Sequence, residues 1–366
     1  MLDQAERSIE EPFVGIRTSS GVLEGLFGLG QPGAPTAEIA TQARRFLGAL
    51  DADRREAASF EIDSDAWRRW SNIHRNLMRH GMPLKECSPA DRDRALNLVA
   101  AALSEEGFRS ARDVMRLNDT LREITGRPDE FGEWFYWLSI FGEPSATEPW
   151  GFQFDGHHVN LNCFVSGEQL VVTPFFLGSE PVIAESGSHR GVSVLQGEEA
   201  DAIALMASLS ADERKAAILG SELPREMFTG AFRDNKVLDC EGIGFDQLSG
   251  AAKERLLALV SRYVGRIRPE HAEAKMREVL DHLDETYFAW IGGTGPDDVF
   301  YYRVQSPVIL IEFDHQSGVV FDNDYPTRRH IHTVVRTPNG NDYGKDLLRQ
   351  HYARYPHPSV VGATAK

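Results

Sequence analysis

Residues 133–178 read EWFYWLSIFGEPSATEPWGFQFDGHHVNLNCFVSGEQLVVTPFFLG. At about Glu133 the apolar pattern changes from the helical period of about 3.6 residues to a period of about two. Alternating apolar and aromatic residues, interrupted by Gly and Pro, are typical of antiparallel strands joined by turns. The dipeptide Ser166-Gly167 predicts one hairpin turn. We therefore expect a β-rich segment over 133–183.

The segments that flank this stretch have the periodicity of helices. TAEIATQARRFLGAL (36–50) and SPADRDRALNLVAAALSEEGFRSARDVMRLNDTLREITG (88–126) repeat apolar residues at intervals of three and four. Ser88 before Pro89 is a predicted N-cap, and Gly126 is a predicted helix stop. SDAWRRWSNIHRNLMRHG (64–81) predicts a further helix with an aromatic face. Helical patterns return over 198–219 and 245–283.

The last part of the chain is again predicted to be β-structure. VFYYRVQSPVILIEFDHQ (299–316) and RHIHTVVRTPNGNDYG (329–344) contain two strands, followed by a short helix, KDLLRQHYARY (345–355). Helices and antiparallel strands come in blocks, which predicts an α+β fold whose antiparallel sheet carries the histidine clusters. We expect one α+β domain over 41–355, helical over 41–130 and 195–285 and β-rich over 133–183 and 298–344. Residues 1–40 are expected to pack on this body as an extension, and 356–366 to form a flexible tail.

The composition argues against several classes of protein. A formal net charge of -16 disfavours a nucleic-acid partner, because such binding depends on clustered Lys and Arg. No stretch offers the roughly 18 apolar residues of a membrane span, and the first residues lack a secretory pattern. The three cysteines are far apart, which predicts reduced thiols rather than disulfides or a thiolate zinc site. We expect a cytoplasmic protein with a small-molecule substrate; the composition leaves a homo-oligomer open.

The strongest local signal for chemistry is His330-Ile331-His332. In a strand, the two imidazoles lie on one face about 6–7 Å apart, a spacing that suits two ligands of one metal ion. The preceding strand is apolar until Glu312 and Asp314, and a buried carboxylate needs a partner. If the two segments pair antiparallel, Glu312 falls close to both histidines and completes a metal site. A solvent-facing or locally hydrogen-bonded pair of histidines is the alternative.

The second cluster is Asp155-Gly156-His157-His158. Adjacent residues in a strand point to opposite faces, so only one of the two histidines can easily join a given site. A bulge at Asp155-Gly156 could re-aim either ring, and both histidines stay candidate metal ligands. Asp155 is a candidate for orienting a ligand imidazole or for catalysis. A hydrogen-bonded strand end without metal is the alternative interpretation.

Further candidates lie on the same strands. Arg303 and Arg336 could clamp a substrate carboxylate, although structural salt bridges explain them equally well. We count both, with Glu312 and Asp155, as candidate catalytic residues. His315 is a candidate extra ligand, but its place at a strand end favours an exposed side chain.

Several blocks of the sequence together resemble a known family. They are GEPSATEPWGFQFDGHHVNLN, VVTPFFLGSEPV, TYFAWIGG, FYYRVQSPVILIEFDHQ and HIHTVVRTPNGNDYG. These blocks resemble the bacterial family catalogued as domain of unknown function 3500, from about Thr41 to His351. Because that family is uncharacterised, the resemblance implies no reaction. It does imply a set of signature positions: Asp155, His157, His158, Glu312, His330, His332, Asn341 and Asp342.

The leading functional hypothesis is a metal-dependent enzyme that acts on a small molecule. A mixed set of histidines and a carboxylate fits zinc or iron(II) better than copper, which favours histidines alone. Hydrolysis is slightly favoured, because a redox-inert ion needs the fewest assumptions. The alternatives are an iron or copper oxidoreductase on the same ligands, a non-catalytic ligand-binding protein with a structural metal or buried histidine network, and a metal-free enzyme with a histidine base.

Overall fold

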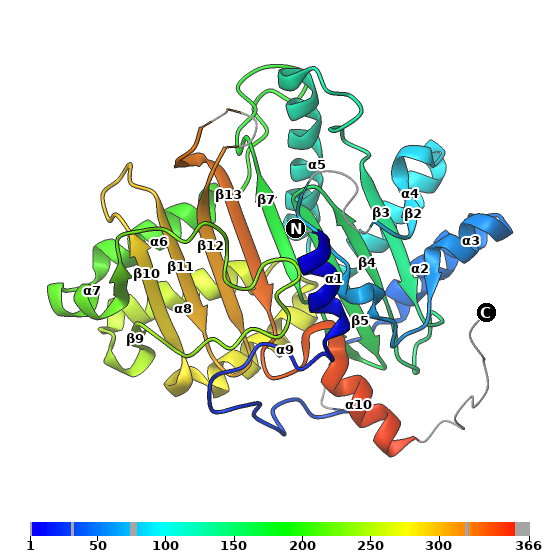
Figure 1. The fold of residues 1–366 in the computed structure, drawn as a ribbon. Helices are drawn as coiled ribbons and strands as arrows, with labels where there is room; N and C mark the ends of the chain where they lie inside the picture. The colour runs from blue at the N-terminus through cyan, green and yellow to red at the C-terminus, as the bar shows by residue number, and fades with distance from the viewer. Residues whose placement is uncertain (1, 31–32, 74–78, 319–320, 322, 356–366) are drawn as a thin grey trace.

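The computed structural model describes residues 2–30, 33–73, 79–318, 321 and 323–355. The predicted flexible tail, 356–366, lies outside these residues. The fold is α+β, as the sequence predicts, and its centre is one mostly antiparallel sheet (Figure 1). The helices are α1 (Leu2–Glu10), α2 (Ala37–Ala49), α3 (Ala52–Ala58), α4 (Pro89–Ala102), α5 (Glu105–Thr125), α6 (Gln196–Ser208), α7 (Ala211–Ala217), α8 (Gly250–Val264), α9 (Pro269–Asp281) and α10 (Lys345–Arg354).

Apart from β10, the long strands of the sheet come from the two segments that were predicted to be β-rich. Their order is β1-β3-β4-β5-β7-β13-β12-β11-β10-β8, with β2, β6 and β9 at the side of this path. Only β1 with β3 and β8 with β10 pair in parallel among the described strands. The strands are β1 (Ser59–Phe60), β2 (Met82–Pro83), β3 (Tyr136–Phe141), β4 (Trp150–Gly156), β5 (Val159–Ser166), β6 (Gln169–Val171), β7 (Phe175–Ser179), β8 (Ile218–Gly220), β9 (Ile243–Gly244), β10 (Tyr287–Gly292), β11 (Phe300–Gln305), β12 (Leu310–Ser317) and β13 (Pro326–Arg336).

The predicted helix boundaries at Ser88 and Gly126 are confirmed. The Ser88 hydroxyl accepts a hydrogen bond from the Asp91 backbone N–H at 3.2 Å, and Gly126 ends α5 in the left-handed conformation. Each of the predicted helical segments 88–126, 198–219 and 245–283 is, however, divided into two α-helices. Among the described helices, none has both the length and the apolarity that a membrane span needs.

One face of the sheet is apolar and is covered by helices. Ile311 and Phe313 of β12 belong to this core, together with residues of α4, α5, α6 and α8. Figure 1 shows α6 and α8 behind β10, β11 and β12. We call this side the helical face. Its burial of aliphatic and aromatic side chains is the main contribution to stability, at roughly 25 cal/mol per Å² of apolar surface.

The opposite face carries polar side chains, and we call it the polar face. Cross-strand pairing places Asp155 opposite Asn160, Arg303 opposite Glu312, and Asp314 opposite His332. The first residues of the chain and the connection 221–242 cover this face: Arg17 pairs with Val237, and α1 lies in front of the sheet in Figure 1. Every polar group here is buried and needs a partner, because an unpaired buried charge or amide costs several kcal/mol.

The predicted helix over 64–81 is wrong. Only Asp65–Arg68 forms a short 3₁₀ helix, and 74–78 lie outside the described residues. The tryptophans of this segment instead pack flat on the polar face. Trp67 stacks on Phe141 at 3.9 Å between ring centroids, and the Trp70 indole N–H donates to the Tyr343 hydroxyl at 2.9 Å. Packing against the sheet has therefore overridden the local helical pattern.

Arg336 is the central cation of the polar face. Its guanidinium donates to Asp342 at 2.8 Å, to Asp234 at 2.7 Å and to the Thr229 carbonyl at 3.2 Å. Arg68 shares Asp234 and also binds the carbonyls of Ser8, Ile9 and Glu11 at the end of α1. The two arginines thus hold the covering segments on the sheet.

We predict that Arg336→Leu lowers the free energy of unfolding by about 3–5 kcal/mol, because it leaves the buried Asp342 without its cation and Asp234 with Arg68 alone. The matched control is Arg54→Leu, which removes an exposed pair with Asp51 and should cost about 1 kcal/mol or less. Urea unfolding of both variants measures the difference. Equal losses would contradict the assignment of Arg336 as the cation that holds the polar face together.

Candidate metal centre

Two parts of the sheet meet at one end of the polar face. The hairpin of β4 and β5 supplies His157 and His158, and β13 supplies His330 and His332. Strand β7 lies between them and pairs with both β5 and β13. Gly178 of β7 stands opposite His332, and a Cβ atom there would lie 2.7 Å from Cδ2 of that ring. The missing side chain lets His332 lean across β7 towards His158.

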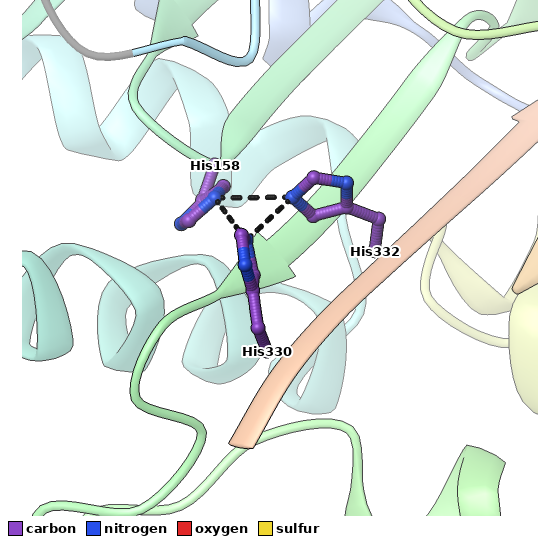
Figure 2. A group of neighbouring side chains, drawn as sticks. All are labelled: His158, His330 and His332. Atoms are coloured by element: carbon purple, nitrogen blue, oxygen red, sulfur yellow. Dashed lines mark hydrogen bonds between the residues drawn. The ribbon is translucent and has the colours of Figure 1, made fainter. Parts of the chain in front are cut away.

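The imidazoles of His158, His330 and His332 converge on one point (Figure 2). Their Nε2 atoms are 2.9 Å apart for His330 and His332, 3.2 Å for His332 and His158, and 3.3 Å for His330 and His158. Three nitrogens that each lie about 2.0–2.1 Å from one ion are about 3.3 Å apart in a tetrahedral site and about 2.9 Å apart in an octahedral one. The three observed separations fall within this range.

The hydrogen bonds around His330 determine which of its nitrogens carries the proton. Its Nδ1 lies 2.8 Å from the Ser317 carbonyl oxygen, which can only accept. Nδ1 must therefore be the donor, and the Nε2 lone pair of the neutral ring points to the common centre. A carboxylate also lies on the outer side of two rings: Glu180 is 3.7 Å from Nδ1 of His330, and Asp314 is 3.9 Å from Nδ1 of His332. Such outer carboxylates orient ligand imidazoles.

Burial favours the neutral form of two of the convergent rings, His332 and His330. It lowers the pKa of His332 well below its ordinary value, and the neighbouring His330 and His157 lower it further. Burial also lowers the pKa of His330, against the opposing effect of Glu180. Asp314 has its pKa raised by burial, and its Oδ1 has no hydrogen-bond partner among the residues that the structure describes. Neutral imidazoles are the form that binds metal.

His157 and His158 do not lie in an extended strand, as the sequence interpretation assumed. They form the two-residue turn between Gly156 and Val159, which are paired. His158 has φ 64°, a left-handed conformation that costs a residue with a Cβ roughly 1–2 kcal/mol. The turn sends His158 to the other two rings. His157 stacks on His158 at 3.9 Å, and its Nδ1 lies 2.8 Å from Oδ1 of Asn118 on α5.

The predicted register of Glu312 is wrong. Glu312 lies opposite Val334, and Asp314 lies opposite His332. The Glu312 carboxylate accepts hydrogen bonds from the Phe228 and Thr229 backbone N–H groups, each at 2.8 Å, and from the Tyr301 hydroxyl at 2.9 Å. It thus holds the connection 221–242 on the sheet. It is not part of the group of three rings, and its catalytic role stays a prediction.

The other candidate catalytic residues are engaged in pairs on the polar face. Asp155 pairs with Arg79 and accepts from the Ser71 backbone N–H at 3.3 Å and from Asn160 at 3.2 Å. Arg303 donates to Glu241 at 2.9 Å and to the Asp239 carbonyl at 3.1 Å. Arg336 is bound to Asp342 and Asp234, as described above. Catalytic roles for these three residues also stay predictions.

His315 differs from its sequence expectation as well, because it is buried on the helical face. Its Nδ1 accepts from the Phe300 backbone N–H at 3.0 Å, and its Nε2 lies 2.9 Å from Glu199. Strand alternation explains the difference: His315 points away from Asp314 and from the three rings.

Some residues of the site carry weak sequence signals. Gly178 and Glu180 reach the site through the β7–β13 pairing, and Ser317 reaches it through the β12–β13 pairing. Asp314 carries a sequence signal, because it ends an apolar strand. Which residue of β13 it faces depends on the β12–β13 pairing, whose register shifts between His315 and Gln316.

Comparison with known proteins gives a family match but no described activity. The model of a family described as "Protein of unknown function (DUF3500)" matches residues 32–345. This range contains the three convergent histidines and their outer carboxylates. No curated protein and no solved structure matches the chain.

We predict that the metal-free protein loses stability as the pH falls below about 6.5. The unfolded chain takes up a proton on His332 in that range, whereas the folded ring has a lowered pKa and does not. Each such group contributes up to about 1.4 kcal/mol per pH unit. His332→Gln should reduce the slope of unfolding free energy against pH.

The control is Phe176→Leu, which trims the ring that packs on His332 at 5.2 Å without removing a titrating group. It should lower stability equally at every pH. An unchanged slope in His332→Gln, with chelator present throughout, would show that this ring is not held neutral.

Proposed function

The chain belongs to the DUF3500 family, and we propose that it is a metal-dependent enzyme acting on a small molecule, in which His158, His330 and His332 hold one divalent ion. The observation that carries the proposal is the convergence of their Nε2 atoms within 2.9–3.3 Å. The Nε2 lone pair of His330 faces this centre, and with their protons on Nδ1 His158 and His332 would turn Nε2 lone pairs to the same point and bind a cation there. The proposal retains the cytoplasmic location, supported by three free cysteines.

The donor set favours zinc. Catalytic zinc sites have three protein ligands and a fourth position for water or substrate, and three histidines are one such set. Non-haem iron oxygenases use two histidines and one carboxylate, and Glu312 in its observed position does not supply that carboxylate. Copper suits imidazole ligands and is therefore the first alternative for a redox reaction.

Hydrolysis is the reaction that we propose for the zinc form. A bound zinc ion supplies Lewis acidity, which activates water and polarises carbonyl or phosphoryl oxygens. The residues of the chain hold and orient this centre: Ser317 fixes the tautomer of His330, and Asp314 lies behind His332. The left-handed turn at His158 brings the third ligand from a different hairpin. Strain of this kind often accumulates at functional sites.

A structural ion in a non-catalytic binding protein is the second candidate. The observation that favours it is the burial of the three histidines, which are 6%, 5% and 9% exposed for His158, His330 and His332. A structural ion is closed off by protein ligands, whereas a catalytic ion keeps an exchangeable position. The two functions therefore predict different behaviour towards small added ligands.

We predict that tag-free protein binds one equivalent of zinc. His158→Asn, His330→Gln and His332→Gln should each weaken binding by more than the roughly 10- to 100-fold that changes outside the ligand set cost. Asn tolerates the left-handed conformation, so the His158 variant keeps its turn. Calorimetric titration against a competing chelator measures the affinities.

Two control variants test whether the metal ligands are the three convergent histidines alone or also include the other residues that the sequence suggested. His157→Gln and Glu312→Gln remove side chains that lie near the site but outside the convergent group, and should change the affinity about tenfold or less. Absence of zinc, copper and iron binding by the wild type would refute the proposed metal site. Full activity of chelator-treated protein would support the metal-free alternative instead.

The open coordination position is tested with cobalt in place of zinc. We expect azide to change the visible spectrum of the cobalt protein saturably, because a catalytic site exchanges its fourth ligand. The control is chloride at equal ionic strength. A spectrum that azide leaves unchanged would favour the structural ion and the non-catalytic function.

A further inference from the structure

Helix α9 presents an unusual side to the interior of the protein. His271, Ala274, Lys275 and Glu278 follow the spacing i, i+3, i+4 and i+7, which places them on one side of the helix. All four line the same cavity. A helix that only covers a sheet carries apolar residues at such positions, as α8 does with its buried leucines and valines. The sequence of α9 therefore indicates that this side of the helix does not pack against a close-packed apolar core.

The cavity has a volume of about 90 Å³ and lies on the helical face of the sheet. Phe175 of β7 and Val335 of β13 form part of its wall, whereas their neighbours Phe176 and Val334 belong to the polar face. The sheet thus separates the cavity from the three histidines. The cavity is partly open to solvent, since Lys275 and Glu278 are half-buried and Glu168 is exposed, so a small molecule can enter it.

Most polar groups around the cavity are already paired with one another. The hydroxyls of Thr173 and Thr337 lie 2.8 Å apart, and Tyr263 binds the Tyr302 hydroxyl at 2.6 Å. The Lys275 ammonium donates to Glu278 at 2.9 Å and to the Val308 carbonyl at 2.8 Å. The charges of the Lys275–Glu278 pair cancel. The other charged residue of the lining, Glu168, is exposed to solvent, so the buried part of the wall offers no net charge to an ionic ligand.

His271 is the exception. It is 3% exposed, and its Nε2 has no hydrogen-bond partner among the residues that the structure describes. Burial lowers the pKa of His271 to about 4, so the ring is neutral at physiological pH. A neutral imidazole can donate to a carbonyl or accept from a hydroxyl, and it does not select an anion.

We propose that this cavity is a second ligand site, which binds a small uncharged molecule with an aliphatic body and one hydroxyl or carbonyl group paired with His271. The walls include Phe175, Ile267 and Val335, which favour an apolar body. A cavity of about 150 Å³ accepts benzene, so this one, at about 90 Å³, suits a ligand with about four non-hydrogen atoms buried. The site does not depend on the metal centre, because it lies on the other face of the sheet.

The experiment titrates full-length protein with 2-butanol, butyrate and butylammonium, which share a four-carbon body. Methyl NMR signals of Val335 and Leu347, which line the cavity, report binding at this position. We expect 2-butanol to shift these signals saturably, and the two charged probes to bind at least about tenfold more weakly. Equal or tighter binding of either charged probe, or shifts by 2-butanol that do not saturate, would overturn the proposal.

Variants locate the ligand. Ala274→Phe fills the cavity and should abolish 2-butanol binding, whereas Glu273→Phe adds the same ring to the exposed side of α9 and should leave binding unchanged. His271→Leu should weaken binding about three- to tenfold through loss of one hydrogen bond. Unchanged binding in Ala274→Phe or His271→Leu would refute the site. The wild-type methyl shifts keep the proposal testable if a variant fails to fold.

Discussion

A polar side chain on a buried sheet face must find a partner, and this requirement organises one whole side of the molecule. Tyr343 and Asp234 illustrate it: the tyrosine hydroxyl donates to the carboxylate at 2.9 Å, and two arginines bind the same carboxylate. Some of the hydrogen-bond partners of these side chains must come from outside the sheet, because the neighbouring strands supply only part of the donors and acceptors that the side chains need. The first residues of the chain and the connection 221–242 therefore pack on the polar face, where their polar groups meet partners. Packing on an apolar face would not specify their positions in this way.

The geometry of the metal centre follows from three local departures from regular structure. The left-handed conformation of His158 points its ring to the site, and Gly178 of β7 leaves space for the ring of His332. A shift in register near His315 determines how the end of β12 pairs with β13. None of these features stabilises the fold by itself. Together they bring side chains from two hairpins to one point, and the strand between them, β7, holds the point rigid.

The sequence was a good guide wherever periodicity and local chemistry decide the structure. It predicted the α+β class, the cap at Ser88 and the stop at Gly126, because these depend on residues within one turn. It failed over 64–81, where tryptophans pack across the sheet instead of along a helix, and it did not assign β10 as a strand. At the site, it identified the histidines but not the register, since Glu312 and Asp314 are two residues apart and only the pairing of β12 with β13 decides which one faces His332.

The three histidines differ from the ion pairs that surround them on the polar face. Elsewhere on the polar face the arginines meet carboxylates: Arg336 meets two aspartates, Arg79 meets Asp155, and Arg303 meets Glu241. At the centre formed by the histidines three imidazole nitrogens meet, and the nearest carboxylates lie behind the rings, at Nδ1 of His330 and His332. This arrangement supports the proposed metal site, because carboxylates behind ligand imidazoles strengthen them as donors to metal.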